Sequence, residues 1–193
     1  MTSILKADTI QDADGNNIIN ENSNTITIGA SGDTTNIIGT LQNNGSAVGG
    51  VNTPAFQATM SGTQSMSDNT ETKIQFDTEV FDTAGAYDHS SNYRFTPQTA
   101  GKYYVYSKVR LQSATSSQLK SAYNFIYKNG SASEQTYWLF WDSFIRSASP
   151  TASTVVEMNG SSDYLECYGL VDVNSGSVTG AVSGVFGAYK IIE

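Results

Sequence analysis

Aromatic side chains are confined to one part of this chain, and their distribution limits what each part can fold into. The 8 Phe, 11 Tyr and 2 Trp residues all lie from Phe56 onward, and none occurs among the first 50 residues. The Gly-Gly pair and the proline of NNGSAVGGVNTP, residues 43–54, indicate a linker at this boundary. We therefore expect an N-terminal region over residues 1–50 and a separate domain over residues 51–193.

The N-terminal region contains short isoleucine-bearing segments separated by the turn sequences DADGNN and GASGD. Its many Asn, Gly, Asp and Thr residues are poor helix formers, so the segments are expected to be short β-strands. A few isoleucines without aromatic partners cannot offset the chain entropy of a monomeric fold. The region is therefore either a flexible Asn-rich tail or a stalk in which several copies intertwine. We favour the stalk, and the candidates for its core are Ile18, Ile19, Ile26, Ile28, Ile37 and Ile38.

The clearest strand pattern lies in YRFTPQTAGKYYVYSKVRL, residues 93–111. After Gly101, apolar side chains recur at every second position from Tyr103, while Tyr104, Tyr106 and charged residues fall on the other face. This alternation is typical of a half-buried strand that is entered through a Pro/Gly turn.

Strand signals recur through the rest of the second region, at residues 53–60, 72–80, 122–128, 135–141, 153–158, 163–173 and 178–192. Asn-Gly pairs after two of these segments indicate hairpin turns. Short strands with polar turns and no helical period predict an all-β sandwich. Cys167 lies among alternating apolar residues, so we expect a buried and inert thiol.

The closing segment, residues 178–192, does not alternate cleanly, because apolar side chains fall on both of its faces. A strand covered on both sides implies a packing surface beyond the sandwich core. Glycines spaced through the segment would let another backbone approach closely. We therefore expect a subunit interface here, and the candidates are Val185, Phe186, Tyr189 and Ile191.

The segment FDTEVFDTAGAYDHSSNYRFTPQTAGKYYVYSKV resembles the signature of the complement globular-head family, the trimeric jelly rolls related to tumour necrosis factor. The matching positions are Phe76, Asp77, Gly85, Tyr87, Phe95, Pro97, Gly101, Tyr103 and Val105. The resemblance extends over most of residues 51–193 and implies a homotrimeric jelly roll. The turn at residues 159–163 departs from the tight Gly-Asp turn of many members, which puts a ligand or calcium role there in doubt. No cofactor is expected, and the sequence does not indicate bound calcium.

In such a domain, Tyr104 and Tyr106 become candidates for subunit packing, since an amphipathic ring buries a large area at little entropic cost. The alternative is that both rings lie partly exposed on a solvated sheet.

The N-terminal sequence SILKADTIQD, with GNNIIN and NTITIGASGDTT after it, resembles the head of marine bacteriophage and cyanophage fibre and appendage proteins. This resemblance implies a virion protein that is made in the host cytoplasm and exposed on the particle. Its N-terminus would attach to other virion proteins, and the jelly roll would form the distal knob.

Several classes of function are disfavoured by composition. The net charge of −8 argues against nucleic-acid binding. A single cysteine permits no internal disulfide or Cys/His zinc spacing, and the start of the chain lacks the long apolar stretch of a membrane anchor. The lone His89 has no nucleophile motif around it, and paired carboxylates on a strand face are usually just solvated. We therefore expect no enzyme, and a glycan-degrading activity is only a remote alternative.

What remains is binding through loops. The loops at residues 112–118, 142–153 and 174–177 are rich in small polar residues and are expected at the end away from the stalk. Aromatic rings stack on sugar faces while polar groups bond hydroxyls. The candidate receptor-binding residues are Trp141, Asp142, Arg146 and Asn174. Ordinary solvated loops are the alternative, and QTYWLFW can equally be an aromatic core strand in which Trp138 and Phe140 are buried before Trp141.

The expected function is adhesion to a host surface, through a glycan or another receptor, by a homotrimeric tail fibre or appendage. A capsid fibre or head-decoration trimer that stabilises the shell is the alternative, because it needs the same trimer.

Overall fold

In the computed structural model, the chain divides into two units, Met1–Gly50 and Val51–Glu193. The structure describes residues 9–11, 13–14, 17–22, 25–28, 31–39, 41–43, 46–47 and 52–191. These described residues form strands and loops but no helix, and so none that could span a bilayer.

The described residues of the first unit form two small antiparallel sheets. Three strands pair in the order β1 (Thr9–Gln11), β2 (Asn17–Asn22) and β3 (Thr25–Ile28), and β4 (Gln42–Asn43) pairs with β5 (Ser46–Ala47). Four candidate stalk residues are exposed in the single chain, namely Ile26, Ile28, Ile37 and Ile38. The side chains of Ile18 and Ile19 lie outside the described part of the chain. Burial of these isoleucines by other copies remains a prediction.

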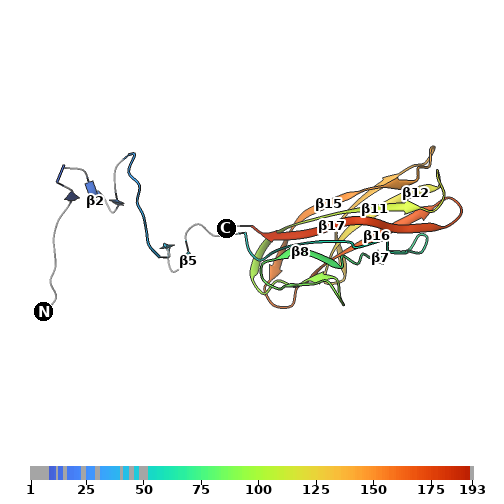
Figure 1. Ribbon diagram of the computed structural model, residues 1–193, viewed down its shortest axis with the longest axis horizontal. Helices are drawn as coiled ribbons and strands as arrows, with labels where there is room; N and C mark the ends of the chain where they lie inside the picture. The colour runs from blue at the N-terminus through green and yellow to red at the C-terminus, as the bar shows by residue number, and fades with distance from the viewer. Residues whose placement is uncertain are drawn as a thin grey trace. The chain divides into compact units, whose positions relative to one another are not determined.

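The second unit is a sandwich of two antiparallel sheets, as expected (Figure 1). The first sheet, called here the β11–β17 sheet, consists of β6 (Ala55–Thr59), β8 (Thr78–Asp82), β11 (Ala100–Ser113), β14 (Ser147–Ala148), β15 (Thr151–Asn159) and β17 (Val178–Lys190). Its order is β14-β11-β17-β6-β8, and β15 also pairs with β11.

The second sheet, called the β12–β16 sheet, consists of β7 (Thr72–Lys73), β9 (Tyr87–Asp88), β10 (Arg94–Phe95), β12 (Leu119–Lys128), β13 (Ser131–Leu139) and β16 (Leu165–Val173). Its order is β13-β12-β16-β10-β9, and β7 also pairs with β16. The strand β13 therefore has a neighbour on one side only.

The core lies between the two sheets and confirms the alternation read from residues 93–111. Tyr103, Val105 and Leu111 on β11 are fully buried, whereas Tyr104 and Tyr106 on the same strand stay partly exposed. Rings from distant segments meet the buried face, where the centroid of Phe56 lies 4.5 Å from that of Tyr87 and 4.4 Å from that of Phe95. Each large apolar side chain buried in this way stabilises the fold by about 1.5–3 kcal/mol.

A small cluster of polar side chains also lies in this core, and its members are hydrogen-bonded. The Oγ of Ser107 donates to Oδ1 of Asn124 at 3.1 Å, and the amide of Asn124 donates to the carbonyls of Ser107 and Pro150 at 3.0 and 3.1 Å. Cys167 is fully buried beside them, with Sγ 3.3 Å from Asn124 Oδ1, so its predicted burial is confirmed.

The interpretation of QTYWLFW as a core strand is wrong for Trp138. This tryptophan lies on the edge strand β13 and is 46% exposed, because no strand of the described residues pairs with the outer edge of β13. Phe140 does pack against the core, and Trp141 is 70% exposed in the loop that follows.

Candidate functional site

Three tyrosines lie side by side on the outward face of the β11–β17 sheet. Tyr104 on β11 pairs in register with Tyr189 on β17, and their ring centroids are 5.5 Å apart. Tyr106 lies one step along β11, with its ring centroid 6.2 Å from that of Tyr104. Val155 on β15 pairs with Tyr104 from the other side and is also exposed. We call this surface the tyrosine face, defined by Tyr104, Tyr106, Val155 and Tyr189.

The ring of Tyr106 lies across the backbone of β17. Its Oη donates to Oε1 of Gln57 on β6 at 2.9 Å. A Cβ added at Gly187 would be 2.4 Å from the Oη of Tyr106. Partial burial raises the pKa of Tyr106, helped by the neighbouring phenols of Tyr189 and Tyr104, so its hydroxyl remains a donor at neutral pH. The Tyr106 ring of the same chain thus explains why residue 187 is a glycine.

The same reason holds for another glycine of β17. A Cβ at Gly180 would be 2.0 Å from the carbonyl oxygen of Gln64, in the same chain. The close approach that the glycines were expected to permit is therefore made here by the chain's own backbone.

The prediction that Phe186 belongs to the subunit interface is wrong. Its side chain is fully buried between the sheets, with its ring centroid 5.1 Å from that of Phe56, and so it belongs to the core. Val185 and Ile191 are partly exposed, as an interface role requires.

The tyrosine face continues into a cationic part farther along β11. Lys108, Arg110, Ser149, Ser183, Gly184 and Val185 line a hollow of about 350 Å³. Arg110 Nη2 lies 3.5 Å from Ser147 Oγ. Among the described residues, the ion pairs join other side chains, and none of them involves Lys108 or Arg110.

The three polar loops predicted at one end do meet. The amide of Ala114 donates to the carbonyl of Ser177 at 2.9 Å, and that of Ser113 donates to the carbonyl of Arg146 at 3.0 Å. The amide of Asn174 donates to the carbonyl of Gln118 at 2.9 Å. The backbones of Arg146 and Asn174 thus hold the loops together, while their side chains are exposed.

Of the four candidate receptor-binding residues, Trp141 lines a hollow on the β12–β16 sheet. Asp142, Arg146 and Asn174 are exposed and are not part of its lining. The hollow has a volume of about 120 Å³ and is lined by Lys120, Ser121, Tyr123, Leu139, Trp141 and Asp172. The structure therefore surrounds Trp141 with residues of β12 and β16 that sequence reasoning missed, because only strand pairing brings them to it.

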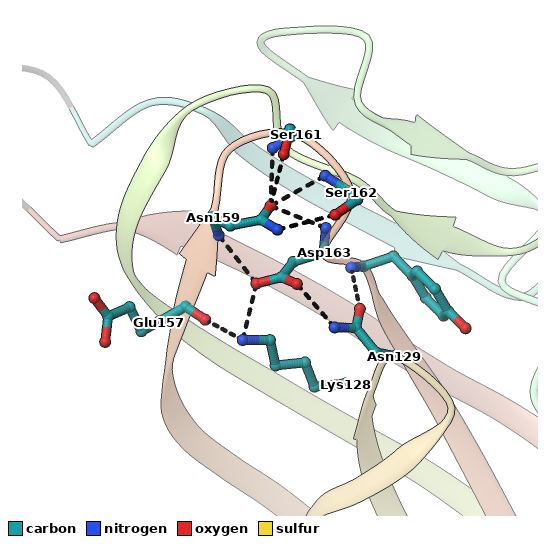
Figure 2. A network of polar contacts seen from close by, with 8 residues as sticks. Lys128, Asn129, Glu157, Asn159, Ser161, Ser162 and Asp163 are labelled. Carbon is teal, nitrogen blue, oxygen red and sulfur yellow. Dashed lines mark hydrogen bonds and ion pairs between the residues drawn. The ribbon is translucent and has the colours of Figure 1, made fainter.

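The turn at residues 159–163 is closed by its own side chains (Figure 2). Asn159 Oδ1 accepts hydrogen bonds from the amides of Ser161, Ser162 and Asp163 at 2.9, 3.0 and 3.1 Å. The carboxylate of Asp163 accepts from the amide of Asn159 at 3.0 Å, from Asn129 Nδ2 at 2.8 Å and from Lys128 Nζ at 2.9 Å.

These donors, Asn129 first, hold the pKa of Asp163 below its usual range. Both carboxylate oxygens are used by protein donors, so the turn acts as a structural clamp between the two Asn-Gly hairpins. Across the described ranges, His, Cys, Asp and Glu side chains do not gather in groups of three that could hold a metal ion.

His89, which was considered for acid–base chemistry, lies near an exposed carboxylate, and the neighbouring Asp88 is bonded within a turn. His89 Nδ1 lies 3.5 Å from Glu79 Oε2, and both side chains are exposed. Asp88 accepts from the amides of Ser90 and Ser91, and these bonds lower its pKa. Such carboxylates stabilise loops, and this geometry does not place them around a common substrate position.

No family model matches the chain, and no curated protein matches it. Solved structures do. The globular domain of the zebrafish complement 1qA protein aligns with a TM-score of 0.54 at 15% identity, over 72% of this chain and 98% of that one. Eiger TNF from S. frugiperda aligns with a TM-score of 0.51 at 10% identity, over 72% and 94% of the two chains. At these identities the likeness concerns the fold alone, and the second unit resembles these domains in its jelly-roll fold.

Proposed function

We propose that this protein is a homotrimeric, non-enzymatic virion protein, a tail fibre or appendage whose jelly roll attaches to a host surface. The first unit would join it to other virion proteins. The observation that carries the proposal is the tyrosine face, which one copy of the chain leaves without a partner.

The composition of this face supports burial against another protein surface. Tyrosines are enriched at the centres of protein interfaces because their rigid, amphipathic rings bury area at low entropic cost. Here Tyr104, Tyr189 and Val155 form one row across three neighbouring strands. Scattered exposed aromatics need no explanation, whereas a contiguous row does.

Charge supports a second copy of the chain as the partner. Lys108 and Arg110 lie beside the aromatic row, and burying them requires acidic groups opposite. The chain has 18 acidic against 10 basic residues, so the rest of its own surface supplies them. A contact between two different patches of identical subunits closes into a ring when the rotation from one copy to the next fits a whole number of copies. A ring of three copies agrees with the family resemblance of residues 76–109.

Attachment to a host surface follows from assembly. A trimer presents three copies of each exposed loop, and linked sites bind a repetitive surface far more tightly than one site does. The loop end of the sandwich, with its exposed Trp141, is where we place that contact.

Sedimentation equilibrium of the full chain tests the assembly. We expect a trimer at micromolar concentration, and a folded monomer for the double variant Tyr104→Ser/Tyr189→Ser. Both side chains are partly exposed, so their removal leaves the core intact. The matched control is Tyr137→Ser on the outward side of β13, which should remain trimeric. A wild-type chain that sediments as a folded monomer would refute the proposal.

Immunogold labelling of virions tests the location. Label at the tail supports adhesion, and label on the capsid would replace it with shell decoration by the same trimer.

A further inference from the structure

The hollow beside Trp141 is assembled by pairing among three strands of the β12–β16 sheet. Ser121 on β12 lies opposite Leu139 on β13 and opposite Asp172 on β16. Lys120 sits at a register shift between Leu119 and Ser121. The side chains that line the hollow therefore sit on rigid strands, and Trp141 on the loop after β13 forms its exposed wall.

Two aromatic rings border this space. Trp141 is the most exposed of the large aromatic side chains in the described part of the second unit, at 70%. Tyr123 stacks on Phe125 with ring centroids 5.8 Å apart and an angle of 7° between the planes. The ring of Tyr123 also stacks against that of Tyr137, with centroids 5.2 Å apart, so Trp141 presents the aromatic face that is open to a ligand. Such ring faces match the C–H faces of a sugar ring.

The charged groups of the hollow form an ion pair. Lys120 Nζ lies 3.0 Å from Asp172 Oδ2, and the Asp172 side chain is only 18% exposed. An ammonium has three donor hydrogens and a carboxylate has two acceptor oxygens, so the pair can still bond neighbouring hydroxyls of one ligand. Because the two charges cancel, the pair favours a neutral polyol over a sugar acid.

We propose that this hollow binds one neutral hexose unit at an exposed position of a surface glycan, with the sugar ring stacked on Trp141 and its hydroxyls bonded to Lys120 and Asp172. The volume of about 120 Å³ is below that of sites for drug-sized ligands, so it suits a single ring. The inference rests on the proposed attachment function for its biological use, since one small site binds weakly and needs the trimer's multivalency.

The experiment titrates the full chain with methyl glycosides of glucose, galactose, mannose and N-acetylglucosamine. Binding is followed by saturation-transfer NMR and by tryptophan fluorescence. Only two tryptophans are present, so Trp138→Phe leaves Trp141 as the sole indole reporter. We expect at least one glycoside to saturate and to shift this Trp141 emission. The methyl glycoside of galacturonic acid, which keeps its free carboxylate, and N-acetylneuraminic acid should not.

Variants then localise the site. Trp141→Ala should weaken the binding roughly tenfold or more, as loss of an aromatic contact worth about 1.4 kcal/mol does. Asp172→Asn, which keeps the shape but removes the charge, should also weaken it. Trp138→Phe alone should bind with unchanged affinity. Failure of every glycoside to bind, or equal affinity in Trp141→Ala and wild type, overturns the inference.

Sedimentation of the same samples separates this result from the proposed function. A trimer without sugar binding refutes the site and leaves the assembly standing. Sugar binding by a wild-type monomer supports the site and refutes the trimer.

Discussion

Tyr106 and Gln57 are joined by a hydrogen bond of 2.9 Å from Oη to Oε1 that crosses a third strand at Gly187. The three residues are opposite one another on β11, β17 and β6. This one contact therefore ties three strands together on the outward side of the sheet, and it fixes the position of a ring in the proposed interface.

Gly187→Ala is expected to disturb both stability and assembly. The new Cβ would lie 2.5 Å from Cζ of Tyr106 and 2.9 Å from the carbonyl oxygen of Phe56, so the ring must move. Overpacking of this kind costs about 1–3 kcal/mol of unfolding free energy, measurable by urea denaturation. Tyr106→Phe keeps the ring and removes only the hydrogen bond, at about 0.5–1.5 kcal/mol. A Gly187→Ala protein as stable as wild type would contradict the described packing.

Gly160→Ala should be far more damaging than Gly85→Ala. Both glycines have positive φ, at +72° and +60°, and alanine there costs about 1–2 kcal/mol by itself. A Cβ at Gly160 would also lie 2.3 Å from the backbone nitrogen of Ala100, whereas nothing lies within 4 Å of one at Gly85. Thermal unfolding of both variants checks this, and equal losses would mean that the turn does not pack on Ala100 as described.

Asp163→Asn should reduce stability at neutral pH, and the loss should fade in acid. The pKa of Asp163 is lowered on folding by Asn129 and Lys128. A carboxyl with a lowered folded pKa stabilises the protein above its unfolded pKa, near 3.8, and loses that contribution as pH falls through the folded value. Melting temperatures from neutral pH to strong acid, with exposed Asp142→Asn as control, measure the difference. A constant difference at all pH values would exclude the clamp as its origin.

The sequence predicted β11 well, because a period of two over a long strand states directly which face is buried. The sequence pattern could not show that Phe186 is buried, because the alternation of inward and outward side chains shifts by one residue within β17. Arg110 pairs with Ser183 and Leu111 pairs with Ala181, so β17 has one extra residue at this point. Such a bulge puts apolar residues of either parity inward. The apparent two-faced pattern of this strand is thus partly a register effect.

The site around Trp141 shows a different limit. The exposed tryptophan could be suspected from its loop, but Lys120 and Asp172 are far from it in sequence and are joined to it only by the order β13-β12-β16. Strand order also explains why Trp138 is exposed and was wrongly predicted to be buried. An apolar run on an edge strand looks the same in sequence as one in the middle of a sheet.

Cys167 should resist thiol reagents in the folded protein. It is fully buried, and burial raises the pKa of its thiol to about 12. The thiolate is the reactive form, so iodoacetamide should modify almost no native protein at mildly alkaline pH. In denaturant, the single thiol should react completely, and mass spectrometry distinguishes the two results.

The raised pKa of Cys167 also predicts how the unfolding free energy changes with pH. Because the pKa of Cys167 is raised on folding, its contribution is complete below the unfolded value, near 9, and is lost as pH rises above it. Cys167→Ser removes this titration, while the serine hydroxyl can still donate to Asn124. When the pH is raised from neutral to above the pKa of the unfolded thiol, wild type should therefore lose more unfolding free energy than the variant. Native labelling at the rate of a free thiol would show instead that the two sheets open readily around Asn124, and the closed core described for this sandwich would then be wrong.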